Sequence, residues 1–468
     1  MVSLDMDRAC FQRGGDTYLS APEQADAQPS CSDHHSPERG GRARKKGLIL
    51  AEDKAVPTDK IAAGLTRRQL IEIDACARCG ECLAWCPVYA QDPRESICSR
   101  GKLRSLKGLV RSGLDEAEQK EFLEGLYECS ACGQCHVVCP VRINTHELWE
   151  QARESLVKAG IPQPEQQIKH LAAIREFNNA YAKPQQERGA WAEKAWKAGL
   201  LREPVRLWKE HRASVLYFAG CTASFDPVMQ AVAVQSARLL QEAGIDFAIL
   251  GPDEPCCASK LRRMGAPGFA DEARKRVDLF REQGIETIVV SCAGCFKGLH
   301  ADYRGILSPS TEVFPLTAYL DRLIGEGRLR PREKVPLRVT YHDPCHLGRH
   351  NQIYSEPRSL LNAIPGIELV EMRRHGPFSA CCGMGGGLKL AKPEIQKKMS
   401  AARVKEAEDT GAEVIITPCQ TCQIGLTVGV EAISSRLRVY HMNEVLIRSV
   451  CPEVCREHIE KAFAAAEE

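Results

Sequence analysis

The stretch Glu286–Cys295, ETIVVSCAGC, joins a short run of β-branched residues directly to a Cys-x-x-Cys pair. The stretch Glu413–Cys422, EVIITPCQTC, has the same form. Runs rich in Val and Ile favour buried strands, and each run ends just before its first cysteine. The repetition therefore predicts two related α/β units, each with a cysteine pair at the carboxyl end of a strand.

Each pair closes a five-cysteine pattern, and this pattern also occurs twice. The two patterns are Cys221, Cys256, Cys257, Cys292 and Cys295, and then Cys345, Cys381, Cys382, Cys419 and Cys422. Five thiols exceed the four that one cubane cluster takes. They predict a larger iron–sulfur cluster in which one thiolate bridges two irons. The alternatives are a plain [4Fe–4S] cluster with a spare thiol, and zinc.

Strands and helices alternate through both copies. Strands are expected at 215–220, 246–250 and 285–291 in the first copy, and before Cys345, at 368–372 and before Cys419 in the second. Helical patterns fill the gaps, and the segments 313–320 and 439–446 close the two copies alike. This alternation predicts parallel sheets, whose ligands gather at the carboxyl ends of the strands.

Two further cysteine runs precede these copies. They read Cys76-x2-Cys79-x2-Cys82-x3-Cys86-Pro87 and Cys129-x2-Cys132-x2-Cys135-x3-Cys139-Pro140. This is the bacterial ferredoxin run, in which the fourth cysteine ligates the other cluster. The expected [4Fe–4S] ligand sets are therefore Cys76, Cys79, Cys82 and Cys139, and Cys129, Cys132, Cys135 and Cys86. Zinc would need neither the third close cysteine nor the Cys-Pro ending.

The chain is expected to be an α+β multidomain protein. The helical pattern between the two ferredoxin runs predicts an α-helical ferredoxin domain over 59–158. Residues 1–58 read as a disordered polar tail, 159–212 as a helical linker, and 213–330 and 331–468 as the two α/β domains. Trp149, Trp191, Trp196 and Trp208, at helical spacing, are expected to make docking contacts.

Composition excludes several classes of function. Lys plus Arg (63) nearly balances Asp plus Glu (61), and aromatic residues make up 6%, which argues against a nucleic-acid partner. The first 50 residues lack the apolar stretch of a signal peptide, and no apolar run reaches the length of a transmembrane helix. A cytoplasmic location is expected, since reducing conditions keep thiols available as ligands; association with the inner face of the membrane would come through a partner.

Some features receive weaker interpretations. The glycine-rich run Gly383–Gly387 does not open a helix after a strand, which argues against dinucleotide binding; these glycines are expected to bring backbone N–H groups close to cluster sulfurs. His342, Asp343 and His346 flank Cys345 and suit either proton delivery or a structural role, so no catalytic residue is assigned. The sequence gives no role for Cys10, Cys31, Cys98, Cys451 or Cys455.

The motifs resemble a known family. CARCGECLAWCP and CSACGQCHVVCP, followed by GCTASFDP, EPCCASKLRRMG, SCAGC, YHDPCHLGRH, ACCGMGGG and PCQTC, are similar to the D subunits of heterodisulfide reductases. More broadly they resemble the iron–sulfur subunits with CCG domains in glycolate, lactate and anaerobic glycerol-3-phosphate oxidising complexes. The resemblance implies one noncubane cluster per five-cysteine set, with a disulfide cleaved between the two clusters. Ala258 departs from the motif, which has glycine there, and puts a complete cluster at the first set in doubt.

Two functions are expected from these features. The first is an oxidoreductase subunit that passes electrons through two [4Fe–4S] clusters to one or two further clusters for disulfide and thiol chemistry. The alternative is a non-catalytic relay that partners a flavoprotein dehydrogenase of 2-hydroxy acids or glycerol 3-phosphate. Under both, the partners are other subunits of a redox complex, a flavoprotein or a membrane cytochrome, and a small-molecule disulfide is a candidate substrate.

Overall fold

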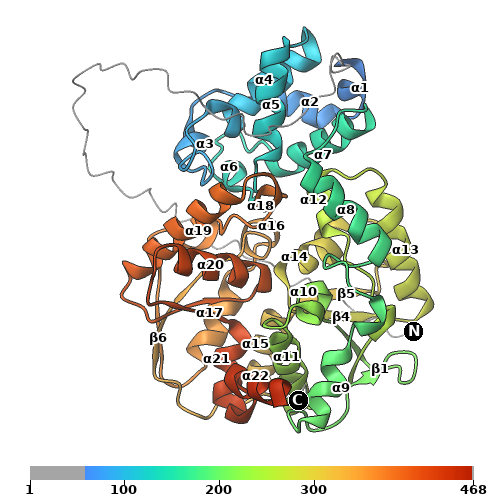
Figure 1. The fold of residues 1–468 in the computed structure, drawn as a ribbon, viewed down its shortest axis with the longest axis vertical. Helices are drawn as coiled ribbons and strands as arrows, with labels where there is room; N and C mark the ends of the chain where they lie inside the picture. Colours follow the sequence, from blue (N-terminus) through green and yellow to red (C-terminus); the bar gives the residue numbers. More distant parts are fainter. Residues whose placement is uncertain (1–57, 466–468) are drawn as a thin grey trace, which may run out of the picture. The chain divides into compact units, whose positions relative to one another are not determined.

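The computed structural model describes residues 58–465, and the elements carry the labels of Figure 1. The expected tail over 1–58, with Cys10 and Cys31, lies outside the described residues except for residue 58. A helical region comes first along the chain and two parallel sheets follow. This order confirms the expected fold class.

The helical region holds the two ferredoxin runs. Its core is built around Leu106, Phe122 and Trp149, each at most 1% exposed. Two helices begin with a capping box, in which Thr66 pairs with Gln69 and Asp115 pairs with Glu118. The elements are α1 Thr58–Ala63, α2 Arg67–Asp74, α3 Glu81–Ala84, the 3₁₀ helix η1 Glu95–Ile97, α4 Ser99–Arg111, α5 Glu116–Tyr127, α6 Gln134–Val137 and α7 Thr145–Lys158.

Helices α4 and α5 approach η1 so closely that only glycine fits at the contacts. A Cβ atom on Gly101 would lie 2.1 Å from the backbone oxygen of Glu95. A Cβ atom on Gly125 would lie 2.1 Å from the backbone oxygen of Ser96. These contacts fix η1 between the two helices, directly before the loop that leads into α4.

The segment expected as a linker also contributes to the first sheet. It contains α8 Glu165–Phe177, the 3₁₀ helix η2 Gln185–Glu187, α9 Ala190–Lys197 and the short strand β1 Arg206–Leu207. Strand β1 pairs with β3 at the edge of the sheet. Trp191 and Trp208 are buried and pack against the sheet core, whereas Trp196 is 40% exposed.

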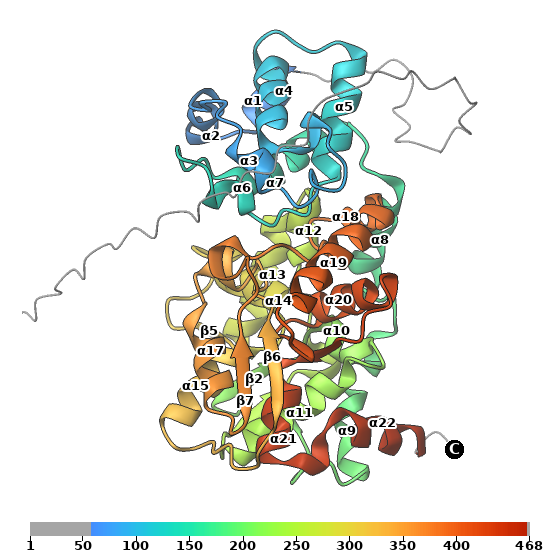
Figure 2. The ribbon, with the colours of Figure 1, turned by 90° about the vertical axis from the view of Figure 1, so that its left-hand side faces the viewer.

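The two sheets repeat one topology. The first has the order β1-β3-β2-β4-β5 and the second β7-β6-β8-β9, and every pairing is parallel. Figure 2 shows β6 and β7 side by side. The predicted duplication and parallel pairing are thereby confirmed. The strands are β2 Val215–Phe218, β3 Phe247–Ile249, β4 Thr287–Val290, β5 Glu312–Pro315, β6 Leu337–Tyr341, β7 Ile367–Val370, β8 Val414–Thr417 and β9 Arg438–His441.

Helices connect the strands of both sheets. Gly284 and Gly411 adopt positive φ just after two of these helices, a backbone conformation that favours glycine at a helix end. The helices of the first copy are α10 Gly220–Phe225, α11 Gln230–Glu242, η3 Gly251–Asp253, α12 Ser259–Met264, α13 Phe269–Glu282, α14 Ala293–Phe296, the π-helix η4 Lys297–Asp302 and α15 Leu316–Gly325. Those of the second are α16 Gly348–Asn351, α17 Ser355–Asn362, η5 Gly376–Phe378, α18 Leu388–Ala391, α19 Pro393–Glu408, α20 Gln420–Ala432, α21 Met442–Val450, η6 Pro452–Val454 and α22 Arg456–Ala465.

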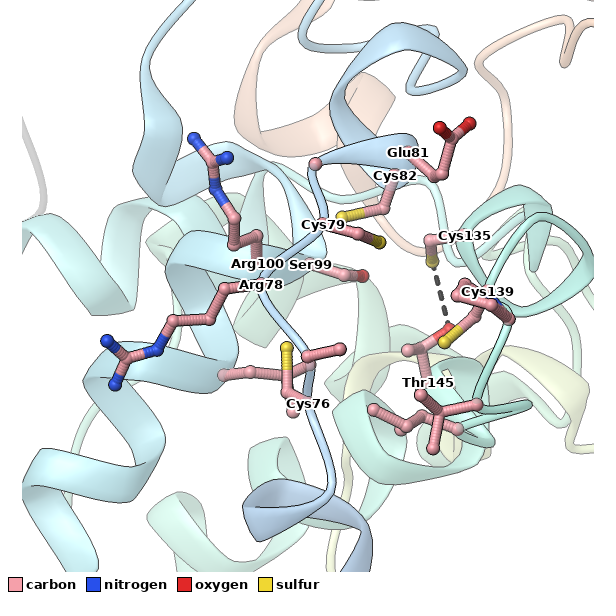
Figure 3. Close-up of a pocket in the computed structure, with 16 residues that line it drawn as sticks. Cys76, Arg78, Cys79, Glu81, Cys82, Ser99, Arg100, Cys135, Cys139 and Thr145 are labelled. Atoms are coloured by element: carbon pink, nitrogen blue, oxygen red, sulfur yellow. Dashed lines mark hydrogen bonds between the residues drawn. The ribbon is translucent and has the colours of Figure 1, made fainter.

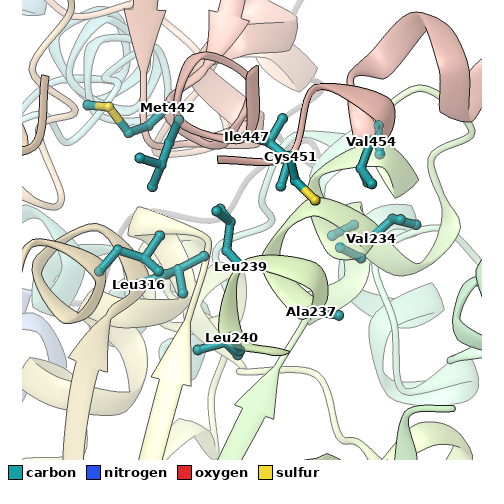
Figure 4. Packing of buried hydrophobic residues seen from close by; sticks show 14 of the residues in the cluster. Val234, Ala237, Leu239, Leu240, Leu316, Met442, Ile447, Cys451 and Val454 are labelled. Carbon is teal, nitrogen blue, oxygen red and sulfur yellow. The ribbon is translucent and has the colours of Figure 1, made fainter. Parts of the chain in front are cut away.

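The two copies share one hydrophobic core. Leu239 of α11 in the first copy and Met442 and Ile447 of α21 in the second are fully buried in the same cluster (Figure 4). Asn443 of α21 also donates a hydrogen bond to Ser236 Oγ of α11 over 2.8 Å. The copies are therefore held together in part by side chains outside the cysteine loops.

No helix within residues 58–465 has the length and apolar character needed to span a lipid bilayer.

Candidate metal-cluster sites

Every cysteine in the described part of the chain is a free thiol. The ten cysteines of the two five-cysteine sets are all buried, and among the eight of the ferredoxin runs only Cys79 is exposed. Buried thiols gathered in groups, without disulfide partners, are the donor set that soft metal centres require.

The first group lies in the helical region. Cys76, Cys79 and Cys82 from the first run and Cys139 from the second line one cavity, as Figure 3 shows. Cys135 also reaches this cavity, where its Sγ lies 2.9 Å from Thr145 Oγ1. The structure thus brings together the four cysteines that the ferredoxin rule assigns to one cluster.

The second group lies beside the first. Cys86 from the first run and Cys129, Cys132 and Cys135 from the second line another cavity. The backbone N–H of Ala131 donates to Cys129 Sγ over 3.4 Å. The fourth cysteine of each run therefore lies with the first three of the other run.

The two runs have matching backbone conformations. Arg78 and Gly80 have φ values of 57° and 92°, and Ala131 and Gly133 have 50° and 76°. Left-handed residues alternating with right-handed ones turn successive N–H groups inward and form a concavity for negatively charged atoms. Both runs are therefore shaped to surround an anionic centre, such as a thiolate-ligated cluster.

The second group contacts the second α/β copy. Arg349 of α16 donates from Nε to the Cys132 backbone oxygen over 2.8 Å, and Arg153 of α7 donates to the Cys129 and Gly386 oxygens over 3.0 and 2.8 Å. The Cys381 side chain next to Cys132 raises the pKa of the Cys132 thiol. A thiol of the ferredoxin region therefore adjoins a thiol of the second five-cysteine set.

All ten cysteines of the two five-cysteine sets line one cavity of about 390 Å³. Cys221, Cys292, Cys345 and Cys419 follow β2, β4, β6 and β8 within a few residues, as the sequence predicted. The neighbouring Cys292 raises the pKa of the Cys419 thiol, so the two sets meet at this pair. Within the second set, Cys382 Sγ lies 3.4 Å from Cys422 Sγ.

A buried arginine contacts the first set. Arg188, in the loop after η2, donates from Nη2 to Cys221 Sγ over 3.0 Å and pairs with Glu254 over 2.5 Å. Glu254 in turn accepts from the backbone N–H groups of Ala219 and Gly220, just before Cys221. The sequence did not point to Arg188, because its polar surroundings resemble an ordinary exposed helix.

The residues that flank Cys345 have different partners. Asp343 accepts two hydrogen bonds from Arg358 and one from the Gly376 N–H, which is a structural role. His342 accepts at Nδ1 from Arg403 over 3.2 Å. Of the three candidates, only His346 lines the cavity.

A chain of histidine rings leads to the cavity that His346 lines. His136 contacts His146, His146 contacts His350, and His350 contacts His346, with ring centroids 5.6, 4.4 and 5.1 Å apart. Both ring nitrogens of His350 lack hydrogen-bond partners among the described residues. No motif spacing indicated this cluster, since its members come from α6, α7 and α16 and the loop before α16.

The glycine run after Cys382 has two roles. The Gly383 N–H donates to Cys381 Sγ over 3.3 Å, as the sequence led us to expect of this run. Gly385 and Gly386 instead make room for another chain segment: Cβ atoms there would lie 2.6 Å from the Ser130 oxygen and 2.3 Å from the Cys129 oxygen. These two glycines allow the ferredoxin run to pack directly on the second copy.

Ala258 has the same left-handed backbone as the glycine it replaces. Its φ is 53°, against 83° for Gly383 in the second copy, and its side chain is fully buried. Left-handed backbone costs a residue with a side chain roughly 1–2 kcal/mol. The first copy therefore keeps the motif's shape with alanine at a strained position.

Charged residues surround part of the cavity. Lys260 donates to His170 Nε2 over 3.1 Å, and burial together with Lys260 lowers the pKa of His170 to about 4. Lys389 is exposed at the same cavity. Arg263, which also lines it, pairs with Glu150 over 2.6 Å, and both side chains are almost completely buried.

The remaining cysteines have local roles. Cys98 precedes α4 and donates from Sγ to the Glu95 oxygen over 3.1 Å. Its side chain also raises the pKa of the neighbouring Cys82 thiol. Cys451 and Cys455 are buried near the chain's end, away from the cavities that the other cysteines line.

Family models match the chain in the regions just described. A 4Fe-4S dicluster domain matches residues 72–143, and a cysteine-rich domain named CCG matches 215–300 and 339–427. The matched segments contain all the grouped thiols. The cofactors of this chain are therefore iron–sulfur clusters.

The related proteins carry the names of redox enzymes or of their subunits. The chain is 35% identical to the D subunit of the dihydromethanophenazine:CoB–CoM heterodisulfide reductase of Methanosarcina barkeri, covering 82% of this chain and 96% of the relative. It is 30% identical to the B subunit of the fumarate reductase (CoM/CoB) of Methanothermobacter marburgensis, covering 77% and 68%. It is 27% identical to the EtfAB:quinone oxidoreductase of Syntrophomonas wolfei, covering 82% of this chain and 59% of that longer protein.

Proposed function

Because the chain belongs to the family of iron–sulfur proteins that includes the D subunits of heterodisulfide reductases, we propose that it reduces or forms a small-molecule disulfide within a redox complex. As an iron–sulfur electron-transfer subunit it shares its coarse role with its relatives. The proposal adds the chemistry of the cavity between the two CCG domains. It also assigns the ligands of each cluster.

The ligand sets follow from the grouping of the thiols. Cys76, Cys79, Cys82 and Cys139 would hold one [4Fe–4S] cluster, and Cys86, Cys129, Cys132 and Cys135 the other. Cys221, Cys256, Cys257, Cys292 and Cys295 would hold a further cluster, and Cys345, Cys381, Cys382, Cys419 and Cys422 another. When bound, these clusters supply electrons one at a time.

One observation carries the proposal: a single cavity contains both five-cysteine sets. The two clusters would occupy part of the about 390 Å³, and the same cavity extends to residues that are not ligands, among them Tyr181, Lys260 and Leu390. A relay between clusters needs no such additional space, whereas a small organic molecule would lie there. Disulfide reduction breaks one S–S bond, takes up two electrons and two protons, and yields two thiols. A cavity with a cluster site on each side suits this two-electron chemistry.

The other residues of the cavity suit an amphipathic disulfide. Tyr181, Met384 and Leu390 supply apolar surface that would exclude water from the sulfur atoms. Lys260 and Lys389 supply positive charge at the same cavity. An anionic substituent on the disulfide would be oriented by these two lysines, with its apolar part towards the cysteines.

The test uses the anaerobically purified chain with a reduced viologen dye as electron donor. We expect low-molecular-weight disulfides to drive dye oxidation, and iron well above the about eight atoms per chain that two cubanes hold. Leu390→Trp should obstruct the part of the cavity beside the cluster ligands and lower the disulfide-dependent rate about tenfold while iron content stays unchanged. Ile433→Trp, at an exposed site, is the matched control. Fully loaded protein that reduces no disulfide would contradict the proposal.

A relay function is the second candidate, and the similarity to the EtfAB:quinone oxidoreductase favours it. Under it, the chain would carry electrons between a flavoprotein and a quinone or cytochrome. The loaded chain would then oxidise the dye when a quinone analogue is added and would not respond to disulfides. Leu390→Trp would leave that rate unchanged.

A further inference from the structure

One face of the helical region exposes a thiol next to positive charge. Cys79 is the exposed cysteine of the ferredoxin runs, and the exposed residues Arg78 and Val141 line the same cavity. Figure 3 shows Arg78 and Arg100 extending from beside Cys76 and Cys79, away from the cavity. Electron exchange between proteins is fastest where a cluster lies near the surface, so this face is where a partner would come close.

A hollow of about 240 Å³ adjoins the thiols on this face. Cys76 forms part of its wall, and Glu95 is its single acidic residue. The hollow is strongly cationic, because its lining includes Arg78, Arg100, Arg104 and Lys107.

Two of these cations are already paired and two are not. Arg100 pairs with Glu95 over 2.9 Å, and Lys107 pairs with Asp74 over 2.9 Å. Arg78 and Arg104 are exposed and form no ion pair within residues 58–465. Net positive charge therefore remains in the hollow, although the whole chain is almost neutral.

We propose that this docking face, formed by Arg78, Arg100, Arg104 and Lys107 beside Cys76 and Cys79, binds the acidic surface of a protein that carries single electrons. The inference rests on the proposed electron-transfer function and names the kind of partner. One electron would pass between the carrier and the chain, so that one is oxidised as the other is reduced. No covalent bond is formed or broken.

The exposure of the charges favours a protein over a small anion. A site for a small anion encloses its ligand with buried donors, whereas Arg78 and Arg104 extend into solvent. Exposed charge of one sign instead steers an oppositely charged protein and raises the association rate roughly 10- to 1,000-fold. The exposed Val141 and Pro140 next to Cys79 supply apolar contact surface.

The experiment compares two protein carriers of opposite charge. Reduced plant-type ferredoxin, with an acidic surface, is mixed with the oxidised loaded full-length chain in a stopped-flow instrument, across a range of ionic strengths. In a parallel experiment a basic cytochrome c in its oxidised form is mixed with the same chain reduced beforehand. The variant is Arg78→Glu with Arg104→Glu, and Arg104→Glu alone leaves the cysteine loop untouched. The control is Lys334→Glu with Arg436→Glu, two exposed residues just before β6 and β9, at the strand ends opposite the cysteine loops.

For wild type we expect the ferredoxin rate constant to fall with ionic strength. The double variant should lower it at least tenfold at low ionic strength and should raise the rate with cytochrome c, while the control changes neither by more than about twofold. Arg104→Glu alone should also lower the rate constant with ferredoxin and raise the rate with cytochrome c. If the double variant loses iron, the result with Arg104→Glu alone tests the proposed docking face.

Three results would overturn the inference: equal effects on both carriers, an equal effect of the control, or inhibition by phosphate at constant ionic strength that matches the double variant. The last would identify a small-anion site. Failure of the proposed function is a separate outcome. The wild-type chain would then show no disulfide-dependent dye oxidation, whatever its rates with the two carriers.

Discussion

Arg188 donates a hydrogen bond from Nη2 to the sulfur of Cys221 over 3.0 Å, inside the protein and beside the buried carboxylate of Glu254. A guanidinium is a permanent positive charge. Its bond to Cys221, as a thiolate ligand, would stabilise the added negative charge of a reduced cluster. Among the described residues no guanidinium donates a hydrogen bond to Cys345 Sγ, and the buried Arg349 acts on Cys345 and Cys381 through its charge alone. The two five-cysteine sets therefore differ in this hydrogen bond.

Replacing Arg188 should therefore make the first set harder to reduce. A charge-assisted hydrogen bond contributes about 1.5–3 kcal/mol, which for one electron corresponds to roughly 60–130 mV. We expect Arg188→Lys to lower the potential of one signal in a redox titration followed by electron paramagnetic resonance. Arg276→Lys is the control, because Arg276 donates to the Cys256 backbone oxygen and not to a sulfur. Equal shifts in the two variants would refute this assignment.

Exchanging the residues that follow the two Cys-Cys pairs, Ala258 and Gly383, should affect stability to different extents. Gly383→Ala would place a Cβ 3.2 Å from Gln396 Cγ at a φ of 83°, so we expect a loss of roughly 1–2 kcal/mol. Ala258→Gly relieves strain but adds freedom to the unfolded chain, and the net change should stay within about 0.5 kcal/mol. Anaerobic denaturant unfolding measures both. A larger loss in Ala258→Gly than in Gly383→Ala would contradict the account.

Glu150 should stabilise the contact between α7 and the first copy. Its pKa is lowered from 4.5: burial raises it, but Arg263, Lys297 and Arg262 outweigh that effect. Glu150→Gln leaves these cations partly uncompensated, and we expect a loss of about 3 kcal/mol at pH 7. Glu154→Gln, whose partners are more exposed, should lose less than about 1 kcal/mol.

The pH dependence provides a second test of Glu150. A carboxylate with a lowered folded-state pKa contributes its full stabilisation above the unfolded value of 4.5 and loses it as the pH falls through the folded-state value. The difference in melting temperature between wild type and Glu150→Gln should therefore be constant from about pH 7 to 5.5 and shrink below 4.5. A difference that is independent of pH would rule out the ionic explanation.

The crossed grouping of the ferredoxin thiols predicts a specific loss of iron. Cys139→Ser should remove the same cluster as Cys76→Ser, about four irons, although Cys139 belongs to the other run. The double variant should lose no more than either single variant. Cys98→Ser should keep full iron, since Cys98 bonds to a backbone oxygen. Additive losses from Cys76→Ser and Cys139→Ser would contradict the crossed arrangement.

Much of the fold could be predicted from local patterns. The runs before Cys292 and Cys419 are rich in β-branched residues, the run before Cys221 is apolar and aromatic, and all three are mostly buried, so strands are favoured there. Their parallel pairing follows from the helices between them. The cysteine grouping was predictable because ligand spacing is a property of the chain itself. Residues 206–207 were missed as a strand because two residues carry no periodicity.

The features that escaped prediction depend on contacts between distant segments. Arg188 lies 33 positions from Cys221, and nothing in a polar, Gln-rich stretch indicates that its guanidinium is buried. Gly385 and Gly386 were expected to serve a cluster, yet their freedom from a Cβ matters mainly because Cys129 and Ser130 pack on them. Such packing is decided by tertiary structure, which a single sequence does not reveal.

The cluster of Leu239, Met442 and Ile447 has a consequence for the speed of electron exchange. It joins the two CCG copies through hydrocarbon contacts of residues that do not line the thiol-lined cavity. Hydrocarbon side chains carry no charge, so we expect the spacing of the two cysteine sets to change little when the clusters change oxidation state. A small nuclear rearrangement for each electron would keep the activation barrier of the transfer low.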